Sequence, residues 1–150
     1  MIILPEIILS LGFLLLLCIS PFIKADSHKF IGYLGLLLIF FTQFSIVKDI
    51  FIFEEVFEGF FIIDSFGSFL KLIILISGGL VLFFYLIVKH DKSLNRPEFS
   101  LVVLISLIGM MFMVSANNLL SLFVSIELQS LALYILVSFS KEDLNSSEAG

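Results

Sequence analysis

Long apolar runs alternate with short polar connections along the whole of this chain of 150 residues. The runs cover residues 2–23, 30–47, 65–88, 99–115 and 118–139, and each is close to the ~20 residues that a helix needs to cross a bilayer. Hydrophobic residues make up 60% of the chain and charged residues 14%, with a mean hydropathy of +1.21, outside the range of soluble domains. The pattern predicts an all-α integral membrane protein with five transmembrane helices in a single membrane domain, residues 1–150.

The polar connections differ in charge, which predicts an orientation. Connections 24–29 and 89–98 are basic, whereas connection 48–64 is mainly acidic. By the positive-inside rule the two basic connections face the cytoplasm or matrix, so the N-terminus lies on the opposite side and the tail with Lys141 lies inside. The first run has only the acidic Glu6 before its apolar centre and no basic n-region, so we expect it to remain in the mature protein rather than to be a signal peptide.

Local signals predict how some of the helices begin and approach one another. The fourth and fifth runs are joined by little more than Ala116-Asn117, which predicts a tight antiparallel pair with Asn117 or Asn118 as the cap of the last helix. In the third run, Ser77-Gly78-Gly79 indicates a close helix approach or a bend rather than an ion site. Phe51 to Ile63 mixes aromatic and acidic residues without a helical period, and we interpret it as an interfacial segment.

The end of the chain is polar. Residues 140–150 are predicted to form a loop, with Ser146 or Ser147 placed as the cap of a further helix and Glu148 in its first turn.

Glu127 is the candidate functional residue, because it lies in the middle of the apolar stretch Leu119–Val137. A carboxylate roughly 13 Å from either end of a membrane helix costs several kcal/mol if charged, so such a group is usually retained for moving ions or protons. Ser130 and Tyr134 share its stripe of the helix. A second stripe holds Ser121, Ser125 and Gln129. We interpret these other polar groups as hydrogen-bonding partners of neighbouring helices, so the helix is expected to face protein or internal water rather than lipid.

The chemistry predicted for Glu127 is proton coupling. A low dielectric disfavours the charged form of a carboxyl group, and a nearby lysine favours it again, so a movable cation near Glu127 acts as a proton switch. Moving one proton charge against 100 mV of membrane potential takes ~2.3 kcal/mol. A change in the free energy of protonating one Glu beside one Lys can be as large as this.

Lys71 is the second candidate, as the only basic residue within a predicted span. In one interpretation it extends to the nearby interface, while Asp64 and Ser65 cap the helix. In the other, Lys71 belongs to a buried polar axis. Pro5-Glu6 fits a proline in the first helical turn with an acid at the positive end of the helix dipole, which we interpret as structural.

Several classes of site are excluded by the remaining residues. The single cysteine, Cys18, lies in the first run, and His28 and His90 lie in polar connections, so neither a cysteine-based metal site nor an intramembrane bis-histidine haem is predicted. No phosphate-binding glycine loop, nucleophile–base pair or metal-ligand cluster is present in the sequence. The net charge is −5 and no basic surface is visible, which excludes nucleic acid as a partner. We expect no cofactor and no metal on this chain.

The run Ser115–Leu136 resembles the fifth-helix motif of subunit 2 of respiratory NADH:ubiquinone oxidoreductase, complex I. The resemblance extends in order to Leu4–Leu9, to Asp64-Ser65-Phe66 with Phe69-Leu70-Lys71, and to Glu148-Ala149-Gly150. It implies the N-terminal part of an antiporter-like inverted-repeat fold in the membrane arm, which helps to pump protons. FMN, iron–sulfur clusters and ubiquinone are then expected on other subunits. Glu127 matches the glutamate that pairs in this family with a lysine on a later, broken helix.

That lysine does not occur in this sequence. Full-length relatives have about fourteen spans with two inverted five-helix repeats, and this chain would supply three leading helices and two of the first repeat. We therefore expect the N-terminal half of a split subunit, with a separate chain that supplies the missing helices. Other membrane-arm subunits and lipid are the remaining expected partners.

The abundance of phenylalanine, 19 residues, and the absence of tryptophan suit an AT-rich organelle genome. They favour the mitochondrial inner membrane over a bacterial plasma membrane. Two other functions stay open. The chain could be a subunit of a multisubunit cation/proton antiporter, or a purely structural membrane subunit in which Glu127 stays protonated and hydrogen-bonded to Ser130 or to a neighbouring helix.

Overall fold

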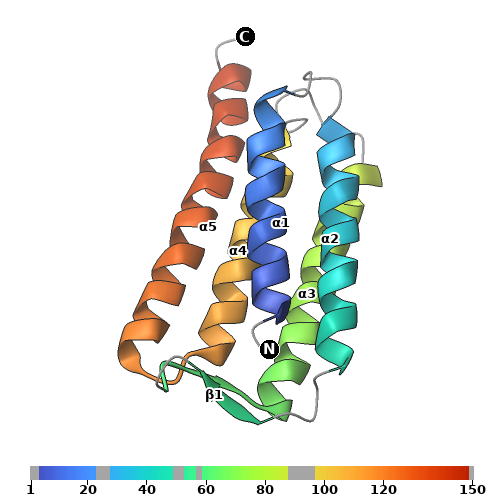
Figure 1. Ribbon diagram of the computed structural model, residues 1–150. Helices are drawn as coiled ribbons and strands as arrows, with labels where there is room; N and C mark the ends of the chain where they lie inside the picture. Colours follow the sequence, from blue (N-terminus) through green and yellow to red (C-terminus); the bar gives the residue numbers. More distant parts are fainter. Residues whose placement is uncertain (1–3, 23–27, 49–52, 57–58, 88–96, 149–150) are drawn as a thin grey trace.

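The computed structural model describes residues 4–22, 28–48, 53–56, 59–87 and 97–148. These residues form long helices and one small β-hairpin (Figure 1). In chain order the elements are α1 (Leu4–Ile19), the 3-10 turn η1 (Ser20–Phe22), α2 (His28–Lys48), β1 (Glu54–Val56), β2 (Phe61–Ile63), α3 (Ser65–Ile87), α4 (Pro97–Ser115) and α5 (Leu119–Glu148).

The helices confirm the predicted all-α membrane fold. Within the described residues, five segments of 18 to 23 residues are long and apolar enough to cross a membrane. A helix satisfies its backbone hydrogen bonds within itself, which a segment surrounded by hydrocarbon must do. Apolar side chains on every face of these helices are therefore compatible both with a helical core and with contact to lipid.

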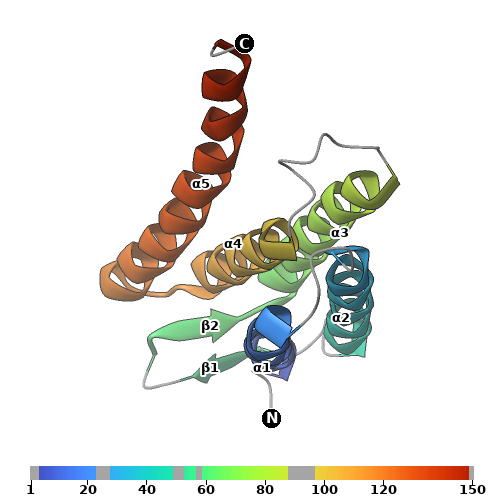
Figure 2. The same ribbon diagram turned by 90° about the horizontal axis from the view of Figure 1, so that it is seen from above.

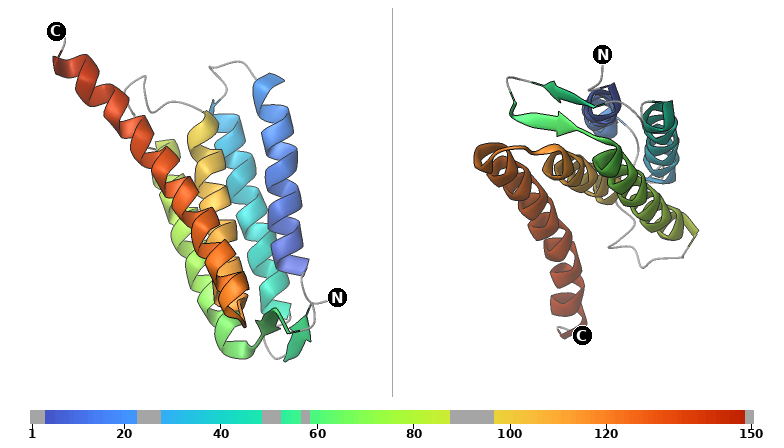
Figure 3. Two further views of the ribbon diagram at one scale, coloured as in Figure 1. Left: turned by 90° about the vertical axis from the view of Figure 1, so that its left-hand side faces the viewer. Right: turned by 90° about the horizontal axis from the view of Figure 1, so that it is seen from below.

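α4 forms the centre of the bundle, and α5 lies at its edge. Of the apolar span in α4, 61% is buried, against 17% in α5. Leu104, Leu107 and Met111 of α4 are fully buried together with Leu75 and Leu82 of α3. α1, α2 and α3 surround the same core, whereas α5 packs chiefly on α4 and leans away from the other helices toward its C-terminus (Figures 2 and 3).

The segment predicted to be interfacial contains an antiparallel hairpin. Glu54 pairs with Ile63 and Val56 with Phe61, and Gly59 in the turn has a φ of +84° that suits glycine. Residues 51–52 and 57–58 of that segment lie outside the described residues. We use the name "hairpin end" for the end of the bundle that holds this hairpin, the starts of α1 and α3 and the end of α4 (Figures 1 and 3).

The prediction of a loop over residues 140–150 is wrong for most of that segment, because α5 continues as a helix to Glu148. The sequence from Leu119 to Glu148 contains no glycine or proline, so nothing in the backbone ends the helix where the side chains become polar. With 30 residues, α5 is about 45 Å long and exceeds the ~30 Å hydrocarbon core. Its last turns extend past the other helices (Figure 1).

Hydrogen bonds fix the turn between α4 and α5 to the hairpin. Asn118 is the cap of α5, because its Oδ1 accepts a hydrogen bond of 2.8 Å from the Ser121 amide. Asn117 instead binds the hairpin: its backbone N–H donates to the Phe60 carbonyl at 3.0 Å, and its side-chain amide donates to the Gly59 carbonyl at 2.8 Å. The direction in which α5 leaves the bundle is thus set at the hairpin end.

Two glycines allow close helix packing. α3 is continuous through Ser77-Gly78-Gly79, and a Cβ added at Gly78 would lie within 3 Å of three side-chain atoms of Leu107, so this glycine permits a close approach rather than a bend. On α4, a Cβ added at Gly109 would lie 3.0 Å from the backbone nitrogen of Gln129. The sequence did not single out Gly109, which sets the distance between α4 and α5.

Candidate functional site

Lys71 forms a buried ion pair with Glu6. The Lys71 Nζ lies 2.5 Å from the Glu6 Oε1, and the two side chains are 3% and 4% exposed. Lys71 therefore does not extend to the interface, which was one of the two interpretations of its sequence position. Glu6 was interpreted only as a dipole-stabilising residue of a first helical turn, and its role as the counter-charge of Lys71 could not be found from local sequence.

Elements that are far apart in the sequence position this pair. Glu6 lies in the first turn of α1 and Lys71 lies about two turns into α3, while both helices pack against α2 and α4. Asp64, the acid nearest to Lys71 in the sequence, caps α3: its Oδ1 accepts a 2.8 Å hydrogen bond from the Gly67 amide. Asp64 thus caps the start of α3, and Lys71 pairs with Glu6, which is more distant in the sequence.

A third helix completes the cluster. The Ser115 hydroxyl, at the end of α4, donates a 3.4 Å hydrogen bond to the Glu6 Oε1. The other carboxylate oxygen, Oε2, is buried and has no hydrogen-bond partner among the described residues. Glu6, Lys71 and Ser115 therefore form one polar cluster at the hairpin end, which we call the Glu6 cluster. It contains an acid, a base and an oxygen that is free to accept a proton.

Glu127 lies on a different face of α5 from the residues that contact α4. Ser121, Ser125 and Ala132 are 6%, 3% and 2% exposed and mark the face toward α4. At 100° per residue, Glu127 points away from that face, and its side chain is exposed. Tyr134, on the same stripe, is 69% exposed. Among the described residues nothing covers the Glu127 carboxylate, and none of them is its ion-pair partner.

The serines of α5 donate chiefly to carbonyl groups of their own helix. The Ser130 hydroxyl bonds to the Ile126 carbonyl at 2.8 Å, and the Ser125 hydroxyl bonds to the Ser121 carbonyl at 2.7 Å. Ser121 itself also reaches out of the helix, to the Phe60 carbonyl of the hairpin at 2.9 Å. The structure shows no hydrogen bond between Glu127 and Ser130, one of the two partners that the purely structural alternative gives to a protonated Glu127, the other being a neighbouring helix.

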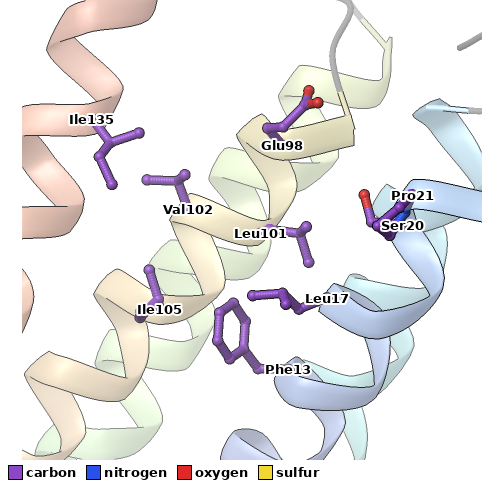
Figure 4. Close-up of a pocket in the computed structure, with 9 residues that line it drawn as sticks. All are labelled: Phe13, Leu17, Ser20, Pro21, Glu98, Leu101, Val102, Ile105 and Ile135. Atoms are coloured by element: carbon purple, nitrogen blue, oxygen red, sulfur yellow. The ribbon is translucent and has the colours of Figure 1, made fainter.

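An apolar groove lies between α1, α4 and α5, toward the end of the bundle opposite the hairpin (Figure 4). It encloses about 560 Å³, and only Ser20 and Glu98 add polar side chains to a lining of aliphatic residues, one phenylalanine and Pro21. The groove contains no pair of groups that could perform acid–base chemistry. Within the part of the chain that the structure describes, no group of three His, Cys, Asp or Glu residues could hold a metal ion.

Comparison with known proteins gives a consistent set of relatives. No protein-family model matches the chain. NADH-quinone oxidoreductase subunit N of Bartonella bacilliformis is 37% identical over 153 residues, which cover 99% of this chain and 30% of the relative. The proteins of the same name from Rhizorhabdus wittichii and Rhodospirillum rubrum are 38% and 36% identical, over 97% and 98% of this chain and 31% of each relative.

A solved structure shares the fold. The chain is similar to part of respiratory complex I from Thermus thermophilus with bound aureothin, with a TM-score of 0.74 and 22% identity, over 88% of this chain and 28% of that chain. The sequence similarity thus makes this chain homologous to part of subunit N of NADH-quinone oxidoreductase, and the solved structure shows that it shares the fold of part of complex I. The predicted resemblance to a complex I subunit is confirmed at this level, and the comparisons do not distinguish subunit 2 from subunit N. The curated relatives carry the name subunit N, and the chain spans about 30% of their length.

Proposed function

We propose that this chain is part of a proton-translocating membrane-arm subunit of complex I, in which Glu127 takes up and releases the translocated proton. NADH oxidation and quinone reduction would occur on other subunits, which carry FMN and iron–sulfur clusters and bind ubiquinone. The resemblance of Ser115–Leu136 to the subunit 2 motif and the similarity to subunits N over nearly the whole chain support this assignment.

The observation that carries the proposal is the position of Glu127. It lies eight residues after the start of α5, ~12 Å along the helix, on a face that the described residues leave open. A carboxylate at that depth in contact with hydrocarbon costs several kcal/mol, so this face is expected to contact other protein or internal water. About 70% of the length of the Bartonella bacilliformis relative lies outside the part that this chain matches, and we propose that the corresponding segments supply the covering helices and a cationic partner.

Substitution of Glu127 by Gln tests the proposal in the assembled complex. The amide is close in shape to the carboxyl group and can still form hydrogen bonds, but it does not take up or release a proton at neutral pH. We expect the variant to assemble and to lose most of the proton pumping that accompanies NADH oxidation, measured in proteoliposomes. Glu98→Gln, an exposed acid at the start of α4, is the matched control and should pump normally. Normal pumping by Glu127→Gln would refute the role of Glu127.

The partners follow from the same proposal. We infer that helices corresponding to the unmatched part of the relatives cover α5 and that they supply the cationic partner of Glu127. The masses and sequences of the chains that co-purify with this protein test both points. Co-purification without flavin, iron–sulfur clusters or quinone reductase activity would instead assign the chain to a multisubunit cation/proton antiporter.

The protein is a multi-pass membrane protein, and we propose the mitochondrial inner membrane as its location. The support is compositional, 19 phenylalanines and no tryptophan, while the relatives named above are bacterial. Subcellular fractionation with an antibody to the chain distinguishes a mitochondrial from a bacterial plasma membrane location.

A further inference from the structure

We propose that the Glu6 cluster is a second proton-exchange site, at the hairpin end of the bundle. This inference rests on the proposed function, because a proton-exchange site is useful only if the subunit moves protons. It assigns proton exchange to Glu6 and Lys71. Stabilisation of the α1 helix dipole and capping of α3 do not require such a role. Both residues belong to this chain, so the site does not depend on the helices that cover Glu127.

Stability is a weak explanation for the pair. Removing two charges from water costs several kcal/mol for each ion, and replacing a buried ion pair by apolar residues of similar volume is often neutral or stabilising. Lys71 is 2% exposed and Glu6 is 4% exposed, so the desolvation cost applies to both residues. Apolar contacts between α1, α2, α3 and α4 already hold the helices together around a common core.

The geometry provides for proton exchange. Lys71 and Ser115 both contact the Glu6 Oε1, and Oε2 is buried with no hydrogen-bond partner among the residues that the structure describes. Buried polar atoms are nearly always hydrogen-bonded, so an unpartnered carboxylate oxygen marks a position that can accept a proton or a water molecule. As a carboxylic acid, Glu6 would carry one O–H donor and one acceptor oxygen, so it could take a proton from Lys71 and give one to a water molecule beside the unpartnered oxygen.

The proposed exchange conserves charge and atoms. In the ion-pair form the proton resides on the Lys71 Nζ, and its transfer to the Glu6 carboxylate gives a neutral amine and a carboxylic acid. The O–H bond of Glu6 then breaks and its proton leaves to water. A proton that arrives at the Lys71 amine restores the ion pair, so one proton passes for each cycle and no electron is transferred.

The location of the cluster suggests its place in the path. The helix ends that the basic connections join in the sequence, the ends of α1 and α3 and the starts of α2 and α4, lie at the opposite end of the bundle (Figure 1). The positive-inside rule therefore predicts that the hairpin end faces away from the cytoplasm or matrix. Ser115 immediately precedes the turn that leads into α5, the helix of Glu127. Among the described residues, Glu6 from α1 and Lys71 from α3 form the ion pair of the cluster, while the Asp64 carboxylate at the start of α3 accepts a hydrogen bond from the Gly67 amide. We therefore assign proton release, rather than uptake, to the Glu6 cluster.

A double variant, Glu6→Gln with Lys71→Met, tests this role in the whole complex. It removes both charges together, so it leaves no unpaired charge even if the single variants fail to assemble. We expect the double variant to assemble and to oxidise NADH, but to lose most of the wild-type ratio of protons pumped to NADH oxidised. Ser100→Ala is the control, because the Ser100 hydroxyl is buried with no hydrogen-bond partner among the described residues but belongs to no ion pair, and this variant should pump normally.

Infrared difference spectroscopy provides a readout that a structural role would not affect. Turnover should produce a carboxyl band of Glu6 that is absent in the double variant, which also lacks the Glu6 carboxyl group. A double variant that pumps normally, or one that does not assemble, would overturn the proposal, as would the absence of the Glu6 band. Loss of pumping in Glu127→Gln with normal pumping in the double variant refutes this inference alone, whereas normal pumping in Glu127→Gln refutes the proposed function.

Discussion

Replacement of Lys71 by Met, which removes a buried ammonium but keeps an unbranched side chain, gives a quantitative test of the ion pair. At the observed separation of 2.5 Å, the Coulomb attraction is about 7 kcal/mol for an effective dielectric constant of ~20. Desolvation costs several kcal/mol for each ion, so the intact pair contributes little net stability. Lys71→Met alone leaves the Glu6 carboxylate buried without its cation, and we expect it to lower the free energy of unfolding by about 3–5 kcal/mol.

A double-mutant cycle measures this loss. The free energy of unfolding of the purified protein in detergent is compared for the wild type, Lys71→Met, Glu6→Gln and the variant with both substitutions. We expect each single variant to be strongly destabilised and the double variant to be close to the wild type, because it contains no unpaired charge. If Lys71→Met unfolded at the same denaturant concentration as the wild type, the carboxylate would have another source of charge compensation and the reasoning would be refuted.

Two further predictions concern the attachment of α5. Gly109→Leu should separate α4 from α5 and lower the free energy of unfolding by about 1–3 kcal/mol, because the new side chain meets the backbone of Gln129. Gly79→Ala is the control, because its added Cβ has ordinary contact distances, and it should be neutral or slightly stabilising in the same unfolding assay. Asn118→Ala should cost about 1 kcal/mol by removing the cap bond to the Ser121 amide and should increase hydrogen exchange in the first turn of α5, and an unchanged exchange rate would contradict the assignment of the cap.

The sequence alone determined the number and approximate limits of the helices in the described part of the chain. In a bilayer, backbone groups must be satisfied within each segment, so the length of an apolar run almost fixes the length of the helix. Local chemistry also determined two termini, since Asp64 and Asn118 precede apolar runs and cap them as predicted. The division of α5 into a serine stripe and a Glu127 stripe followed from helical periodicity in the same way.

The hairpin and the end of α5 were less predictable. Three-residue strands are too short to show a strand period, and their pairing depends on hydrogen bonds to the turn between α4 and α5. The polar residues after 139 favour a loop in the sequence pattern, because the apolar run ends there. A helix without glycine or proline, however, can continue into water beyond the membrane.

Only the tertiary structure paired Glu6 with Lys71. Each residue has an adequate local interpretation, one at a helix dipole and one at an interface, and no periodicity connects α1 with α3. The pairing depends on the rotation and depth of two helices that meet through their packing on α2 and α4, which is set by many small side-chain contacts. Which stripe of α5 faces α4 was decided in the same way, at the close contact between Gly109 and Gln129. Apolar length is a local property of the chain, whereas helix rotation arises from packing between distant segments.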